Sequence, residues 1–126
     1  MSFHEPITLA ERDEACLRAG EFSLRSHLAH QRDWSARNFG PGTRAFGITA
    51  HIASELAEIR AKPDDLDEWI DVVILAFDGA LRQGFQPWEI VGALIRKQAK
   101  NEARRWPDWR HMDEGEPIEH LREEAV

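Results

Sequence analysis

Residues 55–78 read ELAEIRAKPDDLDEWIDVVILAFD, and this stretch decides the fold. It holds two pairs of acids, Glu55 with Glu58 and Glu68 with Asp71, each spaced i, i+3. On a helix, this spacing places both carboxylates of a pair on one side. The Pro-Asp-Asp segment between the pairs ends one helix and caps the next. Two helices with so short a connection form an antiparallel hairpin, in which the four carboxylates can meet.

The second acid pair begins an apolar run, residues 72–77, which ends at Asp78. This run predicts that the helix over residues 65–82 is largely buried. A buried carboxylate that has no partner costs several kcal/mol or loses its charge through a shifted pKa. A bound divalent cation would explain why acids occur on such a helix.

The composition predicts one domain over residues 1–126, because 126 residues with 42% hydrophobic content can form one packed core and not two. In this prediction, residues 1–20 are an accessory N-terminal segment and residues 111–126 are a C-terminal tail. The formal charge of −7 argues against a nucleic-acid partner, since that affinity depends on clustered Lys and Arg.

The single cysteine, Cys16, excludes an intramolecular disulfide and a zinc site built from cysteines. The sequence has no signal-peptide pattern, and none of its apolar stretches approaches the ~20 residues of a membrane span. We therefore expect no membrane partner and a cytoplasmic location.

Hydrophobic periodicity predicts an all-α fold of four to five helices, because no stretch alternates with period two for long enough to form a strand. Local signals set the helix ends. Thr8 and Glu11 match a capping box, and Pro87 stands at a first helical position. The expected helices span residues 8–20, 21–38, 43–61, 65–82 and 87–104, with a short last helix at 118–124.

The two acid pairs have two interpretations. In a chain that is 31% charged, they could be solvated surface acids. Their doubled spacing on consecutive helices favours a cation site, because Mg²⁺ binds carboxylate oxygens and suits phosphate chemistry. Such ions would neutralise a triphosphate and lower the pKa of a water molecule, which Glu55 or Glu58 would orient or deprotonate.

His51 and Asp78 lie near these acids. His51 precedes Glu55 by one helical turn, so it is a partner for that carboxylate, a contact to phosphate or a structural histidine. Asp78 lies two turns after Asp71. It is either a further ligand or an anchor for a substrate sugar or base, or it forms an i, i+4 ion pair with Arg82.

A basic patch is expected on the helix over residues 87–104, formed by Lys97, Lys100, Asn101 and Arg104. The donors of such a patch suit a polyphosphate. The alternative is a solvated basic last turn, which the helix dipole favours.

Trp34, close to the Gly-rich loop at residues 39–44, offers a flat surface on which a base could stack. The alternative is that Trp34 anchors a core or an interface. Base selection would come from Trp34, from this loop with its Arg44, and from Asp78. The loop is not a P-loop, because it lacks the Gly-Lys-Ser/Thr ending.

The chain resembles the MazG-like all-α nucleoside triphosphate pyrophosphohydrolases, most closely the dATP/dGTP diphosphohydrolase branch with its phage MazZ-like members. The doubled acid motif carries this resemblance together with FGPGTR at residues 39–44, DDLDEWIDV at 64–72 and KQAKNEARRWPDWR at 97–110. The resemblance covers residues 22–122. The short connection between the two acid pairs favours the diphosphohydrolase branch over the general family.

The resemblance implies a metal-dependent hydrolase that converts dGTP and dATP to monophosphate and pyrophosphate. It implies that two or three Mg²⁺ or Mn²⁺ ions are held by Glu55, Glu58, Glu68 and Asp71. It also implies contacts from Lys97 and Asn101 to the nucleotide, and a homo-oligomer, a tetramer built from dimers, with sites near subunit contacts.

Three other functions are alternatives to this one. The chain could be a pyrophosphohydrolase of another nucleotide. A ferritin-like di-iron bundle requires Glu-x-x-His pairs, and this sequence has none. A non-catalytic helical oligomerisation or binding module would show no carboxylate-linked cation site, so metal dependence separates it from the enzyme.

Overall fold

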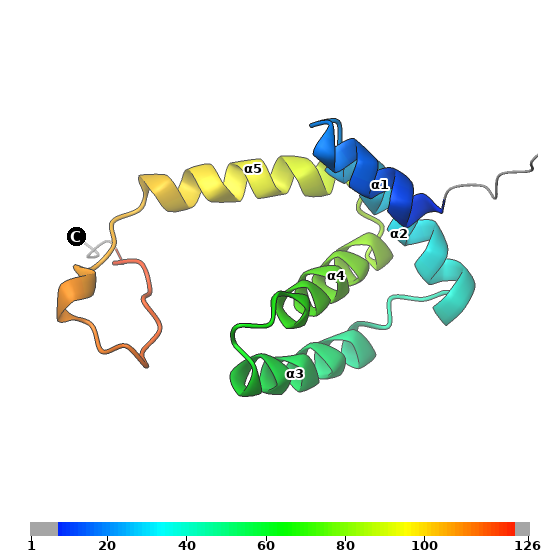
Figure 1. The fold of residues 1–126 in the computed structure, drawn as a ribbon. Helices are drawn as coiled ribbons and strands as arrows, with labels where there is room; N and C mark the ends of the chain where they lie inside the picture. The colour runs from blue at the N-terminus through cyan, green and yellow to red at the C-terminus, as the bar shows by residue number, and fades with distance from the viewer. Residues whose placement is uncertain (1–7, 123–126) are drawn as a thin grey trace, which may run out of the picture.

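The computed structural model describes residues 8–122, which form five α-helices and one short 3₁₀-helix and contain no strand (Figure 1). The prediction of an all-α fold is confirmed. Within the same range, no helix has the length and apolar character needed to cross a bilayer. The helices are α1 (Leu9–Arg18), α2 (Leu24–Phe39), α3 (Ala45–Ala61), α4 (Leu66–Arg82), α5 (Pro87–Ala103) and the 3₁₀-helix η1 (Trp109–His111).

The helix ends follow local signals in the sequence. At α1, the Glu11 amide donates to the Thr8 hydroxyl at 3.2 Å and the Thr8 amide donates to the Glu11 carboxylate at 2.8 Å. These two bonds form the expected capping box. Helix α2 begins later than expected, because the Ser23 hydroxyl accepts a bond from the Ser26 amide and caps it. Pro87 is the first residue of α5, as expected.

Helices α3 and α4 lie side by side as an antiparallel hairpin and share the largest contact between helices within residues 8–122 (Figure 1). Helix α2 packs against both α4 and α5. Helix α5 extends away from the α3–α4 pair (Figure 1). The buried apolar side chains of the described residues are Leu28 of α2, Ile48 and Ile59 of α3 and Leu81 of α4.

The expectation that α4 is largely buried is wrong for this single chain. Ile70, Val73 and Ile74 are 41%, 41% and 39% exposed. The physical reason is that α2 and α3 cover only part of the circumference of α4, whereas the apolar run continues around it. An apolar surface remains that another chain could cover.

The expected last helix is wrong for residues 118–122, which are not helical. In a helix the amide of Leu121 would bond to Pro117, but here it donates to the carbonyl oxygen of Arg105 at 2.8 Å. The tail therefore folds back along the end of α5. Residues 123 and 124 of the expected helix lie outside the described range.

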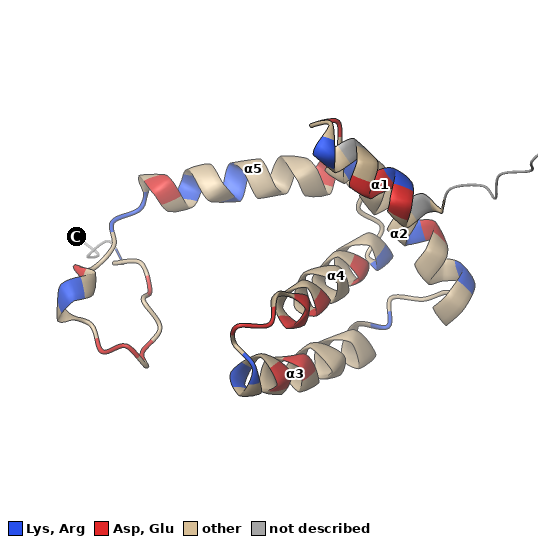
Figure 2. Cartoon of the chain, in the orientation of Figure 1, with Lys and Arg blue, Asp and Glu red and all other residues tan. Residues whose placement is uncertain are grey.

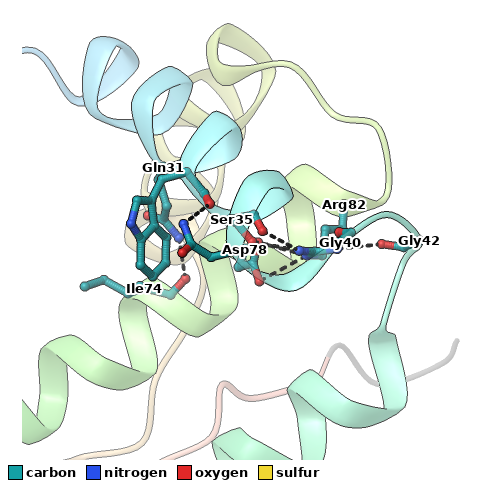
Figure 3. A network of polar contacts seen from close by, with 9 residues as sticks. Gln31, Ser35, Gly40, Gly42, Ile74, Asp78 and Arg82 are labelled. Atoms are coloured by element: carbon teal, nitrogen blue, oxygen red, sulfur yellow. Dashed lines mark hydrogen bonds and ion pairs between the residues drawn. The ribbon is translucent and has the colours of Figure 1, made fainter.

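Polar contacts fix how α2 sits on α4 (Figure 3). The Gln31 side-chain amide donates to the Ile74 carbonyl at 2.8 Å, and the Ser35 hydroxyl donates to Asp78 Oδ1 at 2.6 Å. Both α2 side chains are buried, and leaving a buried polar group unpaired costs about 1–3 kcal/mol. These bonds therefore favour one register of α2 against α4, which places the loop after α2 beside α3.

Candidate functional site

Three of the four expected carboxylates converge where α3 ends and α4 begins. Glu55, Glu68 and Asp71 each supply one carboxylate oxygen, and these three oxygens lie within 4.8 Å of one another. The connection between the helices is well defined, because the Asp65 carboxylate accepts from the Asp67 amide at 3.0 Å and caps α4. Figure 2 shows acids gathered at this end of the hairpin.

Glu58 is not one of the three converging acids, although its charge acts on them. The pKa of Glu68 is raised above its usual value of 4.5, first by lost hydration and then by the negative charges of Glu58, Asp65, Glu55 and Asp71. Crowded like charges favour either a protonated acid or a bound cation. Three of the four acids that the sequence indicated therefore lie together, and Glu58 is not among them. That these acids hold a metal ion stays a prediction.

The cluster fits a hard divalent cation. Carboxylate oxygens are the ligands that Mg²⁺ and Mn²⁺ prefer. Within residues 8–122, Glu55 Oε1 lies 3.2 Å from Nε2 of His51, and neither Glu68 nor Asp71 has a Lys or Arg nitrogen within 4.0 Å. A cation could therefore supply the positive charge that the described side chains do not supply to these two acids.

The raised pKa of Glu68 leads to an expected pH dependence. The folded protein holds this proton more tightly than the unfolded chain, so without divalent ions the stability from Glu68 falls as the pH rises from 4.5 through the raised pKa. A cation at the cluster offsets the negative charge that Glu68 gains when it loses its proton. Stabilisation by Mg²⁺ should therefore grow over the same window, which thermal unfolding with Mg²⁺ and with EDTA measures.

Glu68→Gln is the matched variant for this measurement, because it removes the titrating group and keeps its shape. It should reduce the pH dependence of the Mg²⁺ effect. A Mg²⁺ effect in the wild-type protein that is the same at every pH between 4.5 and neutrality would contradict the assignment.

His51 links the cluster to a neighbouring cleft. Its Nε2 lies 3.2 Å from Oε1 of Glu55, so the expected contact between the two is present. The same ring lines a cleft of about 300 Å³ between α3 and α4. A phosphate contact by His51 stays a prediction.

Two of the residues expected to select a base lie at or beside this cleft. Arg44 lines it and has φ of 49°, a left-handed conformation that costs a non-glycine residue roughly 1–2 kcal/mol. Trp34 is 43% exposed and meets Phe39 edge-on with ring centroids 5.3 Å apart. Phe39 itself lines the cleft, so Trp34 supports one of its walls.

Asp78 forms the ion pair with Arg82 that was one of its two interpretations. Nε of Arg82 donates to the two carboxylate oxygens at 3.1 and 3.2 Å. The side chains of Arg82 and Asp78 are only 8% and 12% exposed. Asp78 also borders the cleft, and a contact from it to substrate stays a prediction.

The basic residues of α5 are separated from the carboxylate cluster in one chain. Figure 2 shows the Lys and Arg positions of α5 apart from the acids of α3 and α4. Lys97 and Lys100 are exposed, and Asn101 Oδ1 accepts from Nη1 of Arg104 at 3.0 Å. The structure therefore brings Asn101 and Arg104 into contact, and places the basic positions of α5 apart from the cluster (Figure 2).

A cleft of about 630 Å³ at the end of α5 holds basic residues that sequence reasoning missed. Arg105, His120 and Arg122 line it together with Arg104. Arg105 follows Arg104 directly in the sequence, and this pair of arginines could have indicated that Arg105 belongs to the basic patch. Arg122 could not be found from periodicity, because it reaches the cleft only through the tail that folds back.

Comparison with known proteins gives the family. A family model described as dATP/dGTP pyrophosphohydrolase matches residues 27–126, which include the hairpin, its acids and α5. The "Eaa protein" of Salmonella phage P22 is 36% identical over 64 residues, which are 51% of this chain and 19% of that protein. This chain thus spans about a fifth of the phage protein, and no solved structure matches. Because the family model covers most of the sequence, the chain belongs to the dATP/dGTP pyrophosphohydrolase family.

Proposed function

We propose that the protein hydrolyses dGTP and dATP at the α-phosphorus and releases a deoxynucleoside monophosphate and pyrophosphate. The observation that carries this proposal is the convergence of three carboxylates from two helices in a chain of this family. The description of the family supports the purine deoxynucleotide class. We propose that the protein acts in the cytoplasm of a bacterium, either as a bacterial protein or as a phage protein made in its host. The similarity to a phage protein supports this location.

The carboxylates would hold Mg²⁺ or Mn²⁺ and position water. Two or three such ions would be held by Glu55, Glu68 and Asp71, with Glu58 alongside. They would neutralise the negative charge of the triphosphate and lower the pKa of a bound water molecule. A spare carboxylate oxygen of Glu55 or Glu58 orients the attacking water and takes its proton. The water oxygen bonds to the α-phosphorus while the bond from that phosphorus to the bridging oxygen breaks, and pyrophosphate leaves.

The basic residues of α5 would bind the phosphates of the substrate. Lys97, Lys100, Asn101 and Arg104 offer donors that stabilise negative charge on the departing pyrophosphate. Because α5 extends away from the α3–α4 pair, these donors would serve the cluster of a neighbouring copy (Figure 2). In this arrangement, the proposed site is complete only when copies of the chain assemble.

A homo-oligomer is also supported by the surface of the chain. The half-exposed apolar face of α4 and the exposed Leu94 and Ile95 of α5 are apolar surfaces of the kind that another chain covers. We propose a tetramer built from dimers, in which such faces are covered.

Light scattering after size-exclusion chromatography tests the assembly. We expect a mass of about four times the chain mass of 14.5 kDa. A mass of one chain at all accessible concentrations would contradict both the tetramer and the shared site.

Chromatographic product analysis with a full panel of ribo- and deoxyribonucleoside triphosphates and Mg²⁺ tests the reaction. Monophosphate and pyrophosphate from dGTP and dATP are expected. Cleavage of a pyrimidine nucleotide would support the proposed reaction and contradict the purine substrate class. An intact panel would favour a non-catalytic binding module.

A further inference from the structure

Trp69 lies in the sequence between the two acids of α4, Glu68 and Asp71. Its indole Nε1 donates a hydrogen bond to the carbonyl oxygen of Pro63 at 3.0 Å. Pro63 belongs to the connection between α3 and α4, so this bond joins the start of α4 to the connection. The ring of Trp69 is 51% exposed, so burial in the core of a single chain does not explain its position.

The connection between α3 and α4 is short and is held by a series of hydrogen bonds. The amide of Lys62 donates to the carbonyl oxygens of Glu58 and Ile59 at the end of α3, at 3.0 and 3.2 Å. The amide of Asp65 then donates to the carbonyl oxygen of Lys62 at 3.1 Å. The indole bond of Trp69 extends this series to the start of α4.

Electrostatic repulsion opposes the arrangement that these bonds hold. One carboxylate oxygen each from Glu55, Glu68 and Asp71 lies within 4.8 Å of the others. The negative charges of Glu58 and Asp65 act on Glu68 as well. Because like charges repel at such distances, the end of α3 and the start of α4 tend to separate when no cation is present.

Apolar packing is stronger at the opposite end of the hairpin. Ile48 and Leu81 are buried there, near the start of α3 and the end of α4. A Cβ added at Gly79 would lie 3.6 Å from Cγ2 of Ile48, so the two helices approach each other closely. At the end that carries the acids, Ile59 is buried but Leu66 is 70% exposed. Polar bonds therefore matter more for closing this end.

We propose that Trp69 is a positioning residue for the carboxylate cluster, an inference that rests on the proposed function. Its indole bond holds the connection against the repulsion of the acids, so Glu68 and Asp71 stay close to Glu55 before a cation binds. A cluster held in this way binds a cation more tightly, because less ordering is required on binding. Trp69 has no oxygen ligand to offer Mg²⁺, and it acts through the carboxylates.

Trp69→Phe tests this role, because phenylalanine keeps an aromatic ring and removes the indole N–H. We expect the dissociation constant for Mn²⁺, measured by electron paramagnetic resonance, to rise by about tenfold. Loss of a group that orients metal ligands typically costs about 10–100-fold in affinity. Thermal unfolding in EDTA should shift less than it does in Asp78→Asn, because water can replace an exposed hydrogen bond.

Trp88→Phe is the matched control for this substitution. Trp88 lies on α5 and is 62% exposed. Within residues 8–122, the indole hydrogen bonds are those of Trp69 and Trp106, so the control removes an indole N–H that bonds to no described residue. Its affinity for Mn²⁺ should equal that of the wild-type protein.

Hydrogen exchange in EDTA gives a readout that does not depend on a metal ion. The amides of Asp65 and Asp67 form bonds of 3.1 and 3.0 Å within the connection and its cap. In Trp69→Phe, these two amides should exchange faster relative to the amide of Ile48, which lies at the other end of the hairpin. Equal acceleration at all three amides would show a general loss of stability and overturn the positioning role.

Asp65→Asn tests whether repulsion is the force that the indole bond resists. Asparagine caps a helix about as well as aspartate, so the substitution removes a negative charge and keeps the cap of α4. In this background, Trp69→Phe should accelerate exchange of the Asp67 amide less than it does in the wild-type protein. An undiminished acceleration would contradict the proposed balance between repulsion and the indole bond.

The outcomes separate this inference from the proposed reaction. The positioning role is overturned if Trp69→Phe binds Mn²⁺ as tightly as the wild-type protein does. If Mn²⁺ binding changes as expected but dGTP stays intact, the proposed hydrolysis fails and the positioning role stands. If the wild-type protein binds no Mn²⁺, both the metal-dependent reaction and the positioning of a metal site fail.

Discussion

Glu55→Gln is expected to abolish dGTP hydrolysis and to weaken Mn²⁺ binding by more than about 100-fold. Glu55 supplies one of the three converging oxygens and also contacts His51, so the substitution removes a negative ligand at the centre of the site. It should not destabilise the protein when divalent ions are absent, because it relieves repulsion among neighbouring acids. Electron paramagnetic resonance with Mn²⁺, product analysis and thermal unfolding with EDTA measure the three effects.

Glu14→Gln is the matched control for this variant. Glu14 lies on α1 with its side chain 76% exposed and forms only a surface ion pair with Arg18 at 3.9 Å. Hydrolysis and Mn²⁺ binding should stay at wild-type levels in this control. If Glu55→Gln binds Mn²⁺ as tightly as the wild-type protein does, the carboxylate cluster is not the metal site.

Asp78→Asn is expected to lower the free energy of unfolding by about 3–5 kcal/mol, and Tm by roughly 10 °C or more. The change leaves the guanidinium of Arg82, which is 8% exposed, without its negative partner. Water cannot compensate a buried charge that the protein no longer pairs. Chemical denaturation followed by circular dichroism measures the loss.

The chain contains a matched control for this pair as well. Asp33 pairs with Arg32 at 3.3 Å, but the two side chains are 61% and 41% exposed. Asp33→Asn should therefore cost no more than about 1 kcal/mol. Equal losses in the two variants would mean that the Asp78–Arg82 pair contributes no more than a surface contact.

Local signals were sufficient to predict the presence of the five α-helices, although they also led to a last helix that residues 118–122 do not form. The capping box at Thr8 and the proline at the start of α5 act within one turn of chain, so they can be recognised without knowing the fold. The i, i+3 spacing of the acids is also local. It predicted the carboxylate cluster once the hairpin between α3 and α4 was assumed.

Features that depend on distant segments were not predictable in this way. The network of Arg82 joins residues more than 40 positions apart, and the sequence indicated only its i, i+4 partner, Asp78. The return of the tail to Arg105 depends on one backbone bond from Leu121. The exposure of α4 depends on which helices cover it. The apolar run in its sequence indicates that the helix prefers burial, but it does not identify the segment or chain that covers it.

Hydrolysis of dGTP in ¹⁸O-labelled water, with Mg²⁺ and mass spectrometry of the products, tests the central claim most directly. If the carboxylate cluster directs water to the α-phosphorus, one ¹⁸O atom will appear in dGMP and the pyrophosphate will be unlabelled. Label in the pyrophosphate would place the attack at the β-phosphorus and contradict the proposed geometry. Recovery of intact dGTP would contradict the enzyme itself.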